Sequence, residues 1–120
     1  MSPVPIPIRI VREPVTLDEL RSLARAQFGE MVKAVVDVQQ GIMAIGGELH
    51  ADEEAVLLDQ GSRQPDLWGI NLYPDAVEVE RVEFDSMINV RPAQGNRSRS
   101  VEDTSRRERI QEIVGRLVRE

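Results

Sequence analysis

The chain of 120 residues contains no cysteine, one histidine (His50) and one lysine (Lys33). Without cysteine it cannot form disulfides, iron–sulfur clusters or thiolate zinc sites, and it has no cysteine nucleophile. A single histidine cannot complete a two-histidine zinc or iron site within one chain. The sequence therefore predicts no metal centre, and it does not specify any cofactor.

Aromatic residues and long hydrophobic runs are also scarce. Aromatics make up 3% of the chain, so the core must be mainly aliphatic; they are Phe28, Trp68, Tyr73 and Phe84. No segment approaches the roughly 20 apolar residues that a membrane-spanning helix needs. The first residues lack the basic start and apolar run of a signal peptide. We therefore expect a cytoplasmic protein without a membrane segment.

The balance of charge is acidic, with a formal net charge of −6 at pH 7. This argues against broad nucleic-acid binding through bulk electrostatics, although Arg91, Arg97 and Arg99 form a local basic group. The hydrophobic fraction of 41% and the charged fraction of 30% are typical of a globular chain. At this length we expect one domain, residues 1–120, with a substantial core.

Helix signals occur at three places in the chain. Thr16 and Glu19 match a capping box, apolar residues follow at helical spacing, and Gly29 can end that helix. A second helix is predicted over residues 53–60, with Asp52 as its N-cap. A third is predicted near the end of the chain, with alternative N-caps at Ser105, Asp103 or Thr104.

Strand signals separate these helices. Alternation over residues 6–11 predicts an edge strand, because Pro7 cannot donate to a ladder. Valine-rich residues 31–38, a Gln-Gln-Gly turn and residues 42–49 predict a hairpin, with a bulge or a close backbone approach at Gly46-Gly47. Further strands are predicted over 67–73 and 81–91. The order β-α-β-β-α-β-β-α predicts an α+β fold with a mainly antiparallel sheet and helices on one face.

Alternation along the predicted strands sorts side chains onto two faces. If the apolar sets face the helices, the opposite face collects a polar set: Lys33, Asp37, Glu48, His50, Asn71, Tyr73, Asp85, Asn89 and Arg91. A bulge at Gly46-Gly47 would move His50 to the other face. Three interpretations stay open, namely a solvated face, a binding or catalytic face, and a dimer interface.

Two segments suggest chemistry on that polar face. Glu48 and His50 could pair as a carboxylate-oriented imidazole, the arrangement of a general base. The stretch from Asn89 to Arg99 could hold an anion, and we name as candidate ligand-binding residues Asn71, Tyr73, Asn89, Arg91, Asn96, Arg97 and Arg99. The alternative is a structural loop whose arginines pair with carboxylates. The glycine pattern and lysine of a P-loop are absent.

Four motifs carry a resemblance over nearly the whole chain: Gly47-Glu48-Leu49-His50-Ala51-Asp52-Glu53, Asp66-Leu67-Trp68-Gly69-Ile70-Asn71-Leu72-Tyr73-Pro74, Glu83-Phe84-Asp85-Ser86-Met87-Ile88-Asn89-Val90-Arg91-Pro92 and Gly95-Asn96-Arg97-Ser98-Arg99. With them the chain resembles a family of short bacterial and archaeal proteins classed as a domain of unknown function. The resemblance implies a small stand-alone protein and brings no activity with it.

Together these patterns predict a small protein with a candidate site for an anionic small molecule on its polar sheet face, with proton transfer as an option. The alternative is an interaction module or homodimer that uses the same face. Nucleic acid is the least favoured partner, because the chain is acidic and lacks exposed aromatic platforms.

Overall fold

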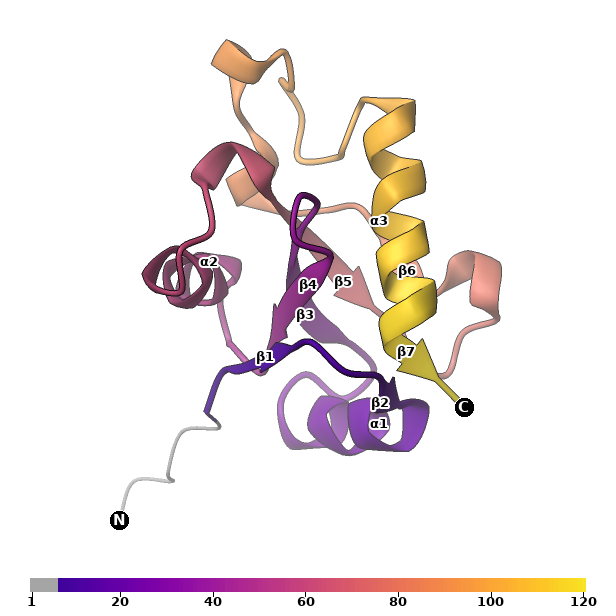
Figure 1. Ribbon diagram of the computed structural model, residues 1–120. Coiled ribbons are helices and arrows are strands. Elements are labelled where there is room, and N and C mark those ends of the chain that lie inside the picture. Colours follow the sequence, from indigo (N-terminus) through magenta and orange to yellow (C-terminus); the bar gives the residue numbers. More distant parts are fainter. Residues whose placement is uncertain (1–6) are drawn as a thin grey trace.

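The computed structural model describes residues 7–120 (Figure 1). Its main sheet has five strands in the order β1-β4-β3-β5-β6, and all neighbouring strands are antiparallel: β1 (Arg9–Val11), β4 (Ile42–Ile45), β3 (Val32–Asp37), β5 (Leu67–Leu72) and β6 (Val82–Glu83). A separate parallel pair joins β2 (Val15–Thr16) to β7 (Val118–Arg119). The helices are α1 (Leu17–Ala26), α2 (His50–Asp59) and α3 (Thr104–Leu117). The predicted α+β class and mainly antiparallel sheet are confirmed.

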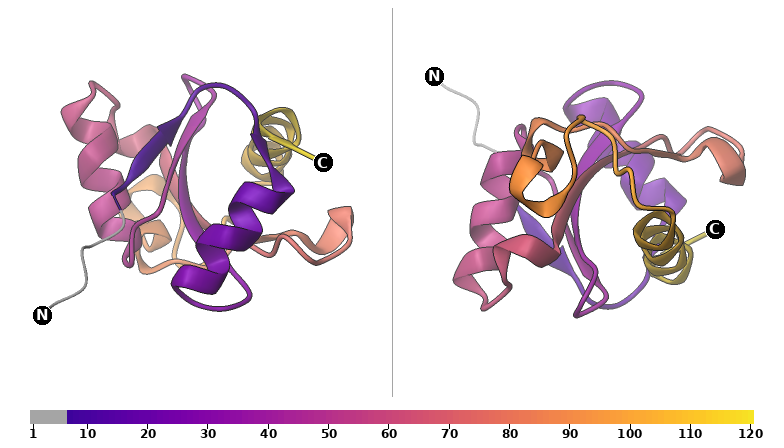
Figure 2. Two further views of the ribbon diagram at one scale, coloured as in Figure 1. Left: turned by 90° about the horizontal axis from the view of Figure 1, so that it is seen from below. Right: turned by 90° about the horizontal axis from the view of Figure 1, so that it is seen from above.

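The helices cover both faces of the main sheet, with α1 and α3 on one side and α2 on the other (Figure 2). The prediction that all helices share one face is therefore wrong for α2. The reason lies in β3, where both alternating sets are apolar: Ala34 and Val36 face α1 and α3, whereas Val35 faces α2. A central strand that is buried on both faces needs a cover on each side.

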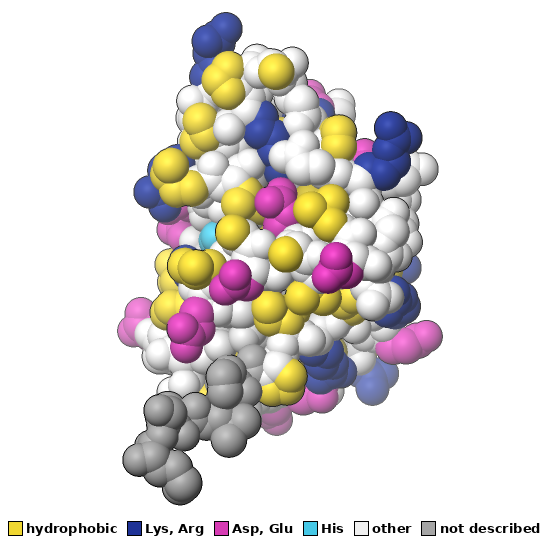
Figure 3. Space-filling view, turned by 90° about the vertical axis from the view of Figure 1, so that its left-hand side faces the viewer, with side chains coloured by type: hydrophobic (Ala, Val, Ile, Leu, Met, Phe, Trp, Pro, Cys, Tyr) yellow, Lys and Arg dark blue, Asp and Glu magenta, His cyan; other side chains and the backbone are white. Residues whose placement is uncertain are grey.

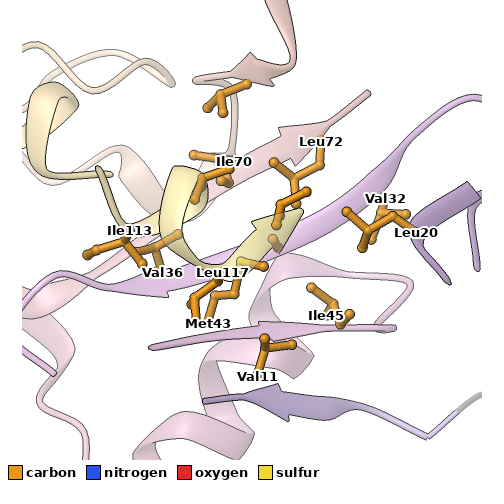
Figure 4. Packing of buried hydrophobic residues seen from close by; sticks show 14 of the residues in the cluster. Val11, Leu20, Val32, Val36, Met43, Ile45, Ile70, Leu72, Ile113 and Leu117 are labelled. Carbon is orange, nitrogen blue, oxygen red and sulfur yellow. The ribbon is translucent and has the colours of Figure 1, made fainter. Parts of the chain in front are cut away.

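The larger core lies between the sheet and the pair α1 and α3 (Figure 4). It is almost entirely aliphatic, as the scarcity of aromatics predicts, and includes Leu20, Met43, Ile70, Ile113 and Leu117. The smaller core lies under α2, where Leu57 packs on Val35, Ala44 and Leu67. On the α2 side, hydrophobic side chains alternate with carboxylates and basic side chains over the surface (Figure 3).

The capping box at α1 is confirmed. The Glu19 amide donates to Thr16 Oγ1 at 3.1 Å, and the Thr16 amide donates to Glu19 Oε2 at 2.8 Å. The helix ends at Ala26, and Gly29, with φ of 93°, donates its amide to the carbonyl of Ala24. The reciprocal bonds between Thr16 and Glu19 satisfy two of the amides that every helix leaves free at its start.

The predicted edge strand and hairpin are present but shorter than expected. β1 is an edge strand of the main sheet, although Ile6 lies outside the described residues. In the hairpin, β4 stops at Ile45, before Gly46-Gly47. A Cβ on Gly47 would lie 2.7 Å from Glu53 Cγ, so this glycine allows α2 to approach the backbone closely.

The second helix starts earlier than predicted, at His50, and its N-cap is Leu49. Leucine offers no oxygen to the first amides, so α2 begins without a side-chain cap. The prediction of Asp52 as N-cap is therefore wrong, and Asp52 lies in the first turn. At α3 the N-cap is Asp103, one of the three alternatives, which accepts from the Arg106 amide at 3.2 Å.

The predicted strand over 81–91 is wrong beyond its first residues. β6 comprises only Val82 and Glu83, and the chain then forms two 3₁₀ turns, Met87–Asn89 and Pro92–Gln94. Ser86 caps the first turn by accepting from the Ile88 amide at 3.3 Å. Serine and asparagine side chains compete with the backbone for hydrogen bonds, which ends the strand despite its alternating sequence.

Candidate functional site

An open cleft of about 550 Å³ lies where the start of α2 meets β3, β5 and the segment after β6. Polar residues from separate parts of the chain line it: Lys33, His50, Asn71, Tyr73, Asp85 and Arg99. All except Arg99 belong to the polar face that strand alternation predicts, and Arg99 reaches the cleft from the following loop. Hydrophobic side chains complete its walls, including Met31, Leu49 and Met87.

A cross-strand row forms part of the cleft. Lys33 of β3 is in register with Asn71 of β5, which is in register with Glu83 of β6. Asn71 Nδ2 donates to Glu83 Oε1 at 2.8 Å and to the Asp85 carbonyl at 3.3 Å, and the Tyr73 hydroxyl donates to Glu83 Oε1 at 3.3 Å. Burial, followed by the Glu83 carboxylate, raises the pKa of Tyr73. The phenol therefore stays protonated at neutral pH and acts as a donor.

Both basic side chains of the cleft keep donors available. Arg99 Nε donates to Asp85 Oδ1 at 2.7 Å, and its guanidinium makes no second ion pair within residues 7–120. Lys33 Nζ lies 5.4 Å from the centroid of the Phe28 ring and has no hydrogen bond or ion pair in the described part of the chain. The loop arginine thus both reaches the sheet face and pairs with a carboxylate there.

His50 is buried at the start of α2, and in Figure 3 the single histidine shows only as a small cyan area. Its Nε2 lies 2.7 Å from the Ile70 carbonyl. A carbonyl can only accept, so we assign the proton to Nε2, which leaves the lone pair on Nδ1. Burial lowers the pKa of His50, so the ring is neutral at pH 7. The exposed Glu48 makes no hydrogen bond to it, and the structure does not bring this predicted pair together.

Glu53 lies one helical turn after His50 and is fully buried. Its Oε2 accepts from the Gly47 amide at 3.0 Å, whereas its Oε1 has no partner among the described residues. Burial raises the pKa of Glu53 to about 9, so this carboxyl is protonated at neutral pH. It contributes no charge to the neighbouring cleft.

Two of the predicted ligand-binding asparagines bind backbone. Asn89 accepts from the Gly69 amide at 2.8 Å and donates to the Gly69 carbonyl at 2.9 Å, so its side chain takes the place of a partner strand beside β5. Asn96 donates to the carbonyls of Asn89 and Ser100, each at 2.7 Å, and accepts from the Glu102 amide at 2.9 Å. Neither side chain lines the cleft.

Arg91 is buried outside the cleft. Its guanidinium donates to the carbonyls of Leu67 and Ile88 and lies 3.4 Å from the Glu54 carboxylate. It also lies 4.5 Å from the centroid of the Trp68 ring, within the range of a cation–π contact. Burial lowers the pKa of Arg91, and the Glu54 charge opposes that shift. These contacts tie the 3₁₀ segment to β5.

The remaining predicted polar residues lie apart from the cleft. Asp37 accepts from the Gln39 and Gln40 amides, both at 2.9 Å, and closes the turn between β3 and β4. Arg97 is exposed, and its backbone amide donates to Glu102 Oε2 at 2.8 Å. The structure thus brings together five residues of the predicted polar face. Asp37, Asn89 and Arg91 instead bond to the backbone of the fold, and Glu48 is exposed.

Several cleft residues received no predicted role. Glu83, Ser86 and Met87 line the cleft from the segment that sequence alternation treats as one long strand. The signal that could identify Glu83 is its alternation with Asp85, which matches the spacing of Asn71 and Tyr73 on the neighbouring strand. Met87 shares the parity of Glu83 and Asp85, so alternation also places it on this face.

Residues 7–120 contain neither a cluster of metal-binding side chains nor a membrane-spanning helix. In this part of the chain, no three histidine, aspartate or glutamate side chains gather closely enough to hold a metal ion. No helix of the described residues combines the length and apolar character needed to cross a bilayer.

Among the comparisons with known proteins, only the comparison with family models gives a match. No curated protein and no solved structure matches it. A family model described as "Protein of unknown function (DUF5674)" matches residues 9–117, which confirms the resemblance seen in the sequence. The chain therefore belongs to this family of proteins of unknown function.

Proposed function

We propose that the protein binds a small polar molecule in the cleft and holds an anionic group of it between Lys33 and Arg99. The observation that carries this proposal is convergence: Lys33, His50, Asn71 and Arg99 come from four separate segments and line one hollow. Ligand sites are typically concave, with apolar walls and a few polar groups that fix orientation. Met31, Leu49 and Met87 supply such walls here.

Lys33 and Arg99 give the cleft two cationic groups that can bind an anion. Lys33 has no ion-pair partner in the described part of the chain, and Arg99 keeps guanidinium donors beyond its bond to Asp85. The start of α2 adds free amide donors, because Leu49 provides no side-chain cap. Uncapped amides and the positive end of the helix dipole both favour negative charge.

Proton transfer in the cleft would fall to His50. Its Nε2 proton is held by the Ile70 carbonyl, and its ring is neutral at pH 7, so Nδ1 can accept a proton from a bound molecule. Glu48 lies outside the cleft and cannot share this role. A binding protein needs no such step, so catalysis is the optional part of the proposal.

Isothermal titration calorimetry with a panel of small phosphates and carboxylates tests the binding function. Lys33→Met and Arg99→Ala should each weaken a bound anion by about tenfold, because a hydrogen bond between charged groups contributes about 1.5–3 kcal/mol. Arg97→Ala is the matched control, since Arg97 lies two residues from Arg99 and outside the cleft. Equal losses in Arg97→Ala and Arg99→Ala would contradict an anion site in the cleft.

A homodimer through the same face is the second candidate. Leu49 and Met87, which flank the cleft, are 57% and 66% exposed. Exposed apolar residues beside polar ones are typical of contact surfaces. Light scattering after size-exclusion chromatography tests it: the wild type should be dimeric and Met87→Glu monomeric. A wild-type chain that stays monomeric at high concentration excludes this candidate.

A further inference from the structure

Asn71 carries an acceptor atom that the fold does not use. The side chain is 6% exposed and lines the cleft, yet its Oδ1 has no hydrogen-bond partner within residues 7–120. Buried polar atoms are almost always paired, because leaving one unpaired costs about 1–3 kcal/mol. The atom belongs to a residue that lines the cleft, so a donor that enters the cleft and reaches it would complete its hydrogen bonding.

Exchanging the nitrogen and oxygen of the Asn71 amide does not pair the free acceptor. Nδ2 already donates to Glu83 Oε1 at 2.8 Å and to the Asp85 carbonyl at 3.3 Å. Both partners are acceptors, so exchanging the amide nitrogen and oxygen would set oxygen against oxygen twice. The two acceptors therefore fix the orientation of the Asn71 amide. Neither of them supplies a donor to Oδ1.

Acceptors dominate the surroundings of that atom. The carboxylates of Glu83 and Asp85 line the same cleft, and each has one bonded oxygen and one oxygen without a side-chain donor in the described part of the chain. Lys33, the register partner of Asn71, lies instead over Phe28. Acceptors near Asn71, Glu83 and Asp85 thus lie beside cationic donors at Lys33 and Arg99.

We infer, on the basis of the proposed binding function, that the ligand is zwitterionic. It presents a primary ammonium group to Asn71 Oδ1 and to the carboxylates of Glu83 and Asp85, and it presents its anionic group to Lys33 and Arg99. An ammonium carries three donors and matches three neighbouring acceptors. Oδ1 is almost fully covered, so the incoming ammonium group must displace the atoms that cover it. The substrate class is amino-bearing phosphates or carboxylates of low mass.

Matched probes separate this inference from simple anion binding. We would titrate the protein by calorimetry with 2-aminoethyl phosphate, ethyl phosphate and ethylamine, and then with homologous series of two to six carbons ending in phosphate or carboxylate. The best amino-bearing probe should bind at least tenfold tighter than the probe of the same length without the amine. This ratio reflects one hydrogen bond between charged groups.

The variant Glu83→Gln sharpens the test. It keeps an oxygen that accepts from Asn71 and Tyr73, and it replaces the free carboxylate oxygen with an NH2 group, which removes the negative charge. It should weaken the amino-bearing probe about tenfold and leave the amine-free probe unchanged or tighter. Lys33→Met should weaken both probes. Circular dichroism checks that each variant is folded, and the wild-type comparison of probes needs no variant.

Each outcome has a definite meaning. If amine-free probes bind as tightly as amino-bearing ones, the zwitterion inference is overturned and the anion site stands. If Mg²⁺ or Ca²⁺ alone binds through Glu83 and Asp85 with greater affinity than any amine, the inference is overturned in favour of a metal cation. If no probe of either series binds, the proposed binding function fails, and the inference fails with it.

Discussion

The fold uses the hydrogen-bonding groups of Asn89 and Arg91 more fully than those of Asn71 and Arg99. Asn89 uses both ends of its amide on the backbone of Gly69, whereas Asn71 leaves its Oδ1 unused at the cleft. The Arg91 side chain is 7% exposed and donates to three backbone carbonyls, whereas that of Arg99 is 57% exposed and makes one ion pair. The two asparagines differ in how many of their hydrogen-bonding groups the fold uses, and the two arginines differ in this and in exposure.

The difference shows how to separate scaffold from site in a small fold. A polar side chain whose donors and acceptors are all paired inside the protein has nothing left for a ligand. A polar side chain that lines a cleft and keeps an unpaired donor or acceptor can bind a small molecule through that group. By this criterion Asn89 and Arg91 hold the fold together, while Asn71 and Arg99 are the residues that we propose for binding.

Removal of Arg91 should give the largest effect on stability. Arg91→Ala takes a buried donor from the Leu67 and Ile88 carbonyls and leaves the Glu54 charge without its partner. We expect a loss of about 3–5 kcal/mol in the free energy of unfolding, measured by urea denaturation. Arg97→Ala, on the exposed part of the same segment, should change it by less than about 0.5 kcal/mol. Similar values for both would remove the distinction between scaffold and surface arginine.

The two asparagines should differ in the same sense. Asn89→Ala leaves the amide and carbonyl of Gly69 unpaired in a buried place, at a cost of about 2–4 kcal/mol. Asn71→Ala loses bonds to an exposed carboxylate and one carbonyl, and should cost about 1 kcal/mol. Thermal denaturation compares the two directly. A larger loss for Asn71 would assign that residue to the scaffold.

Glu53 gives a prediction about pH. Its pKa is 4.5 in the reference state and about 9 in the folded protein. Between these values the folded chain keeps a proton that the unfolded chain releases, so the contribution of Glu53 to stability is fully present below pH 4.5 and is lost as the pH rises towards 9. Glu53→Gln does not titrate and should be more stable than the wild type at pH 8, by about 1–3 kcal/mol. Parallel melting-temperature profiles from pH 4 to 9 would contradict the buried neutral acid.

The smallest effect concerns the ion pair of the cleft. Arg99 and Asp85 are both substantially exposed, so the coupling between Arg99→Ala and Asp85→Ala in a double-mutant cycle should be about 0.5 kcal/mol or less. A coupling several times larger would show that Arg99 belongs to the scaffold like Arg91. The predicted loss of anion affinity in Arg99→Ala must therefore occur with nearly unchanged stability.

Local signals in the sequence predicted much of the fold. The capping box at Thr16, the hairpin and the edge position of β1 follow from residue types whose bonding partners are close in sequence. The sequence does not predict which helix covers which face of the sheet. The apolar run of Ala34, Val35 and Val36 indicates only that both faces of this strand are covered. The parallel pair of β2 and β7 joins residues about a hundred positions apart and leaves no local pattern.

The candidate site was predicted by composition and only partly by position. Lys33, Asn71, Tyr73 and Asp85 share a face because true strands alternate, and the structure brings them together. Asn89 and Arg91 were assigned to that face through a strand that ends at Glu83. Asn89 bonds to the Gly69 backbone through its side chain, whereas a strand residue would do so through its own backbone. The sequence pattern is the same in both cases, so it does not distinguish them.

The Asn89 amide has a consequence for how the molecule behaves in crowded solution. β6 pairs with β5 only at Asn71 and Leu72, so the backbone of Gly69 would otherwise offer a free donor and acceptor to any extended peptide. By occupying both, Asn89 blocks that part of the sheet edge against pairing with another chain. We therefore expect Asn89→Ala to open this part of the strand to pairing with another chain.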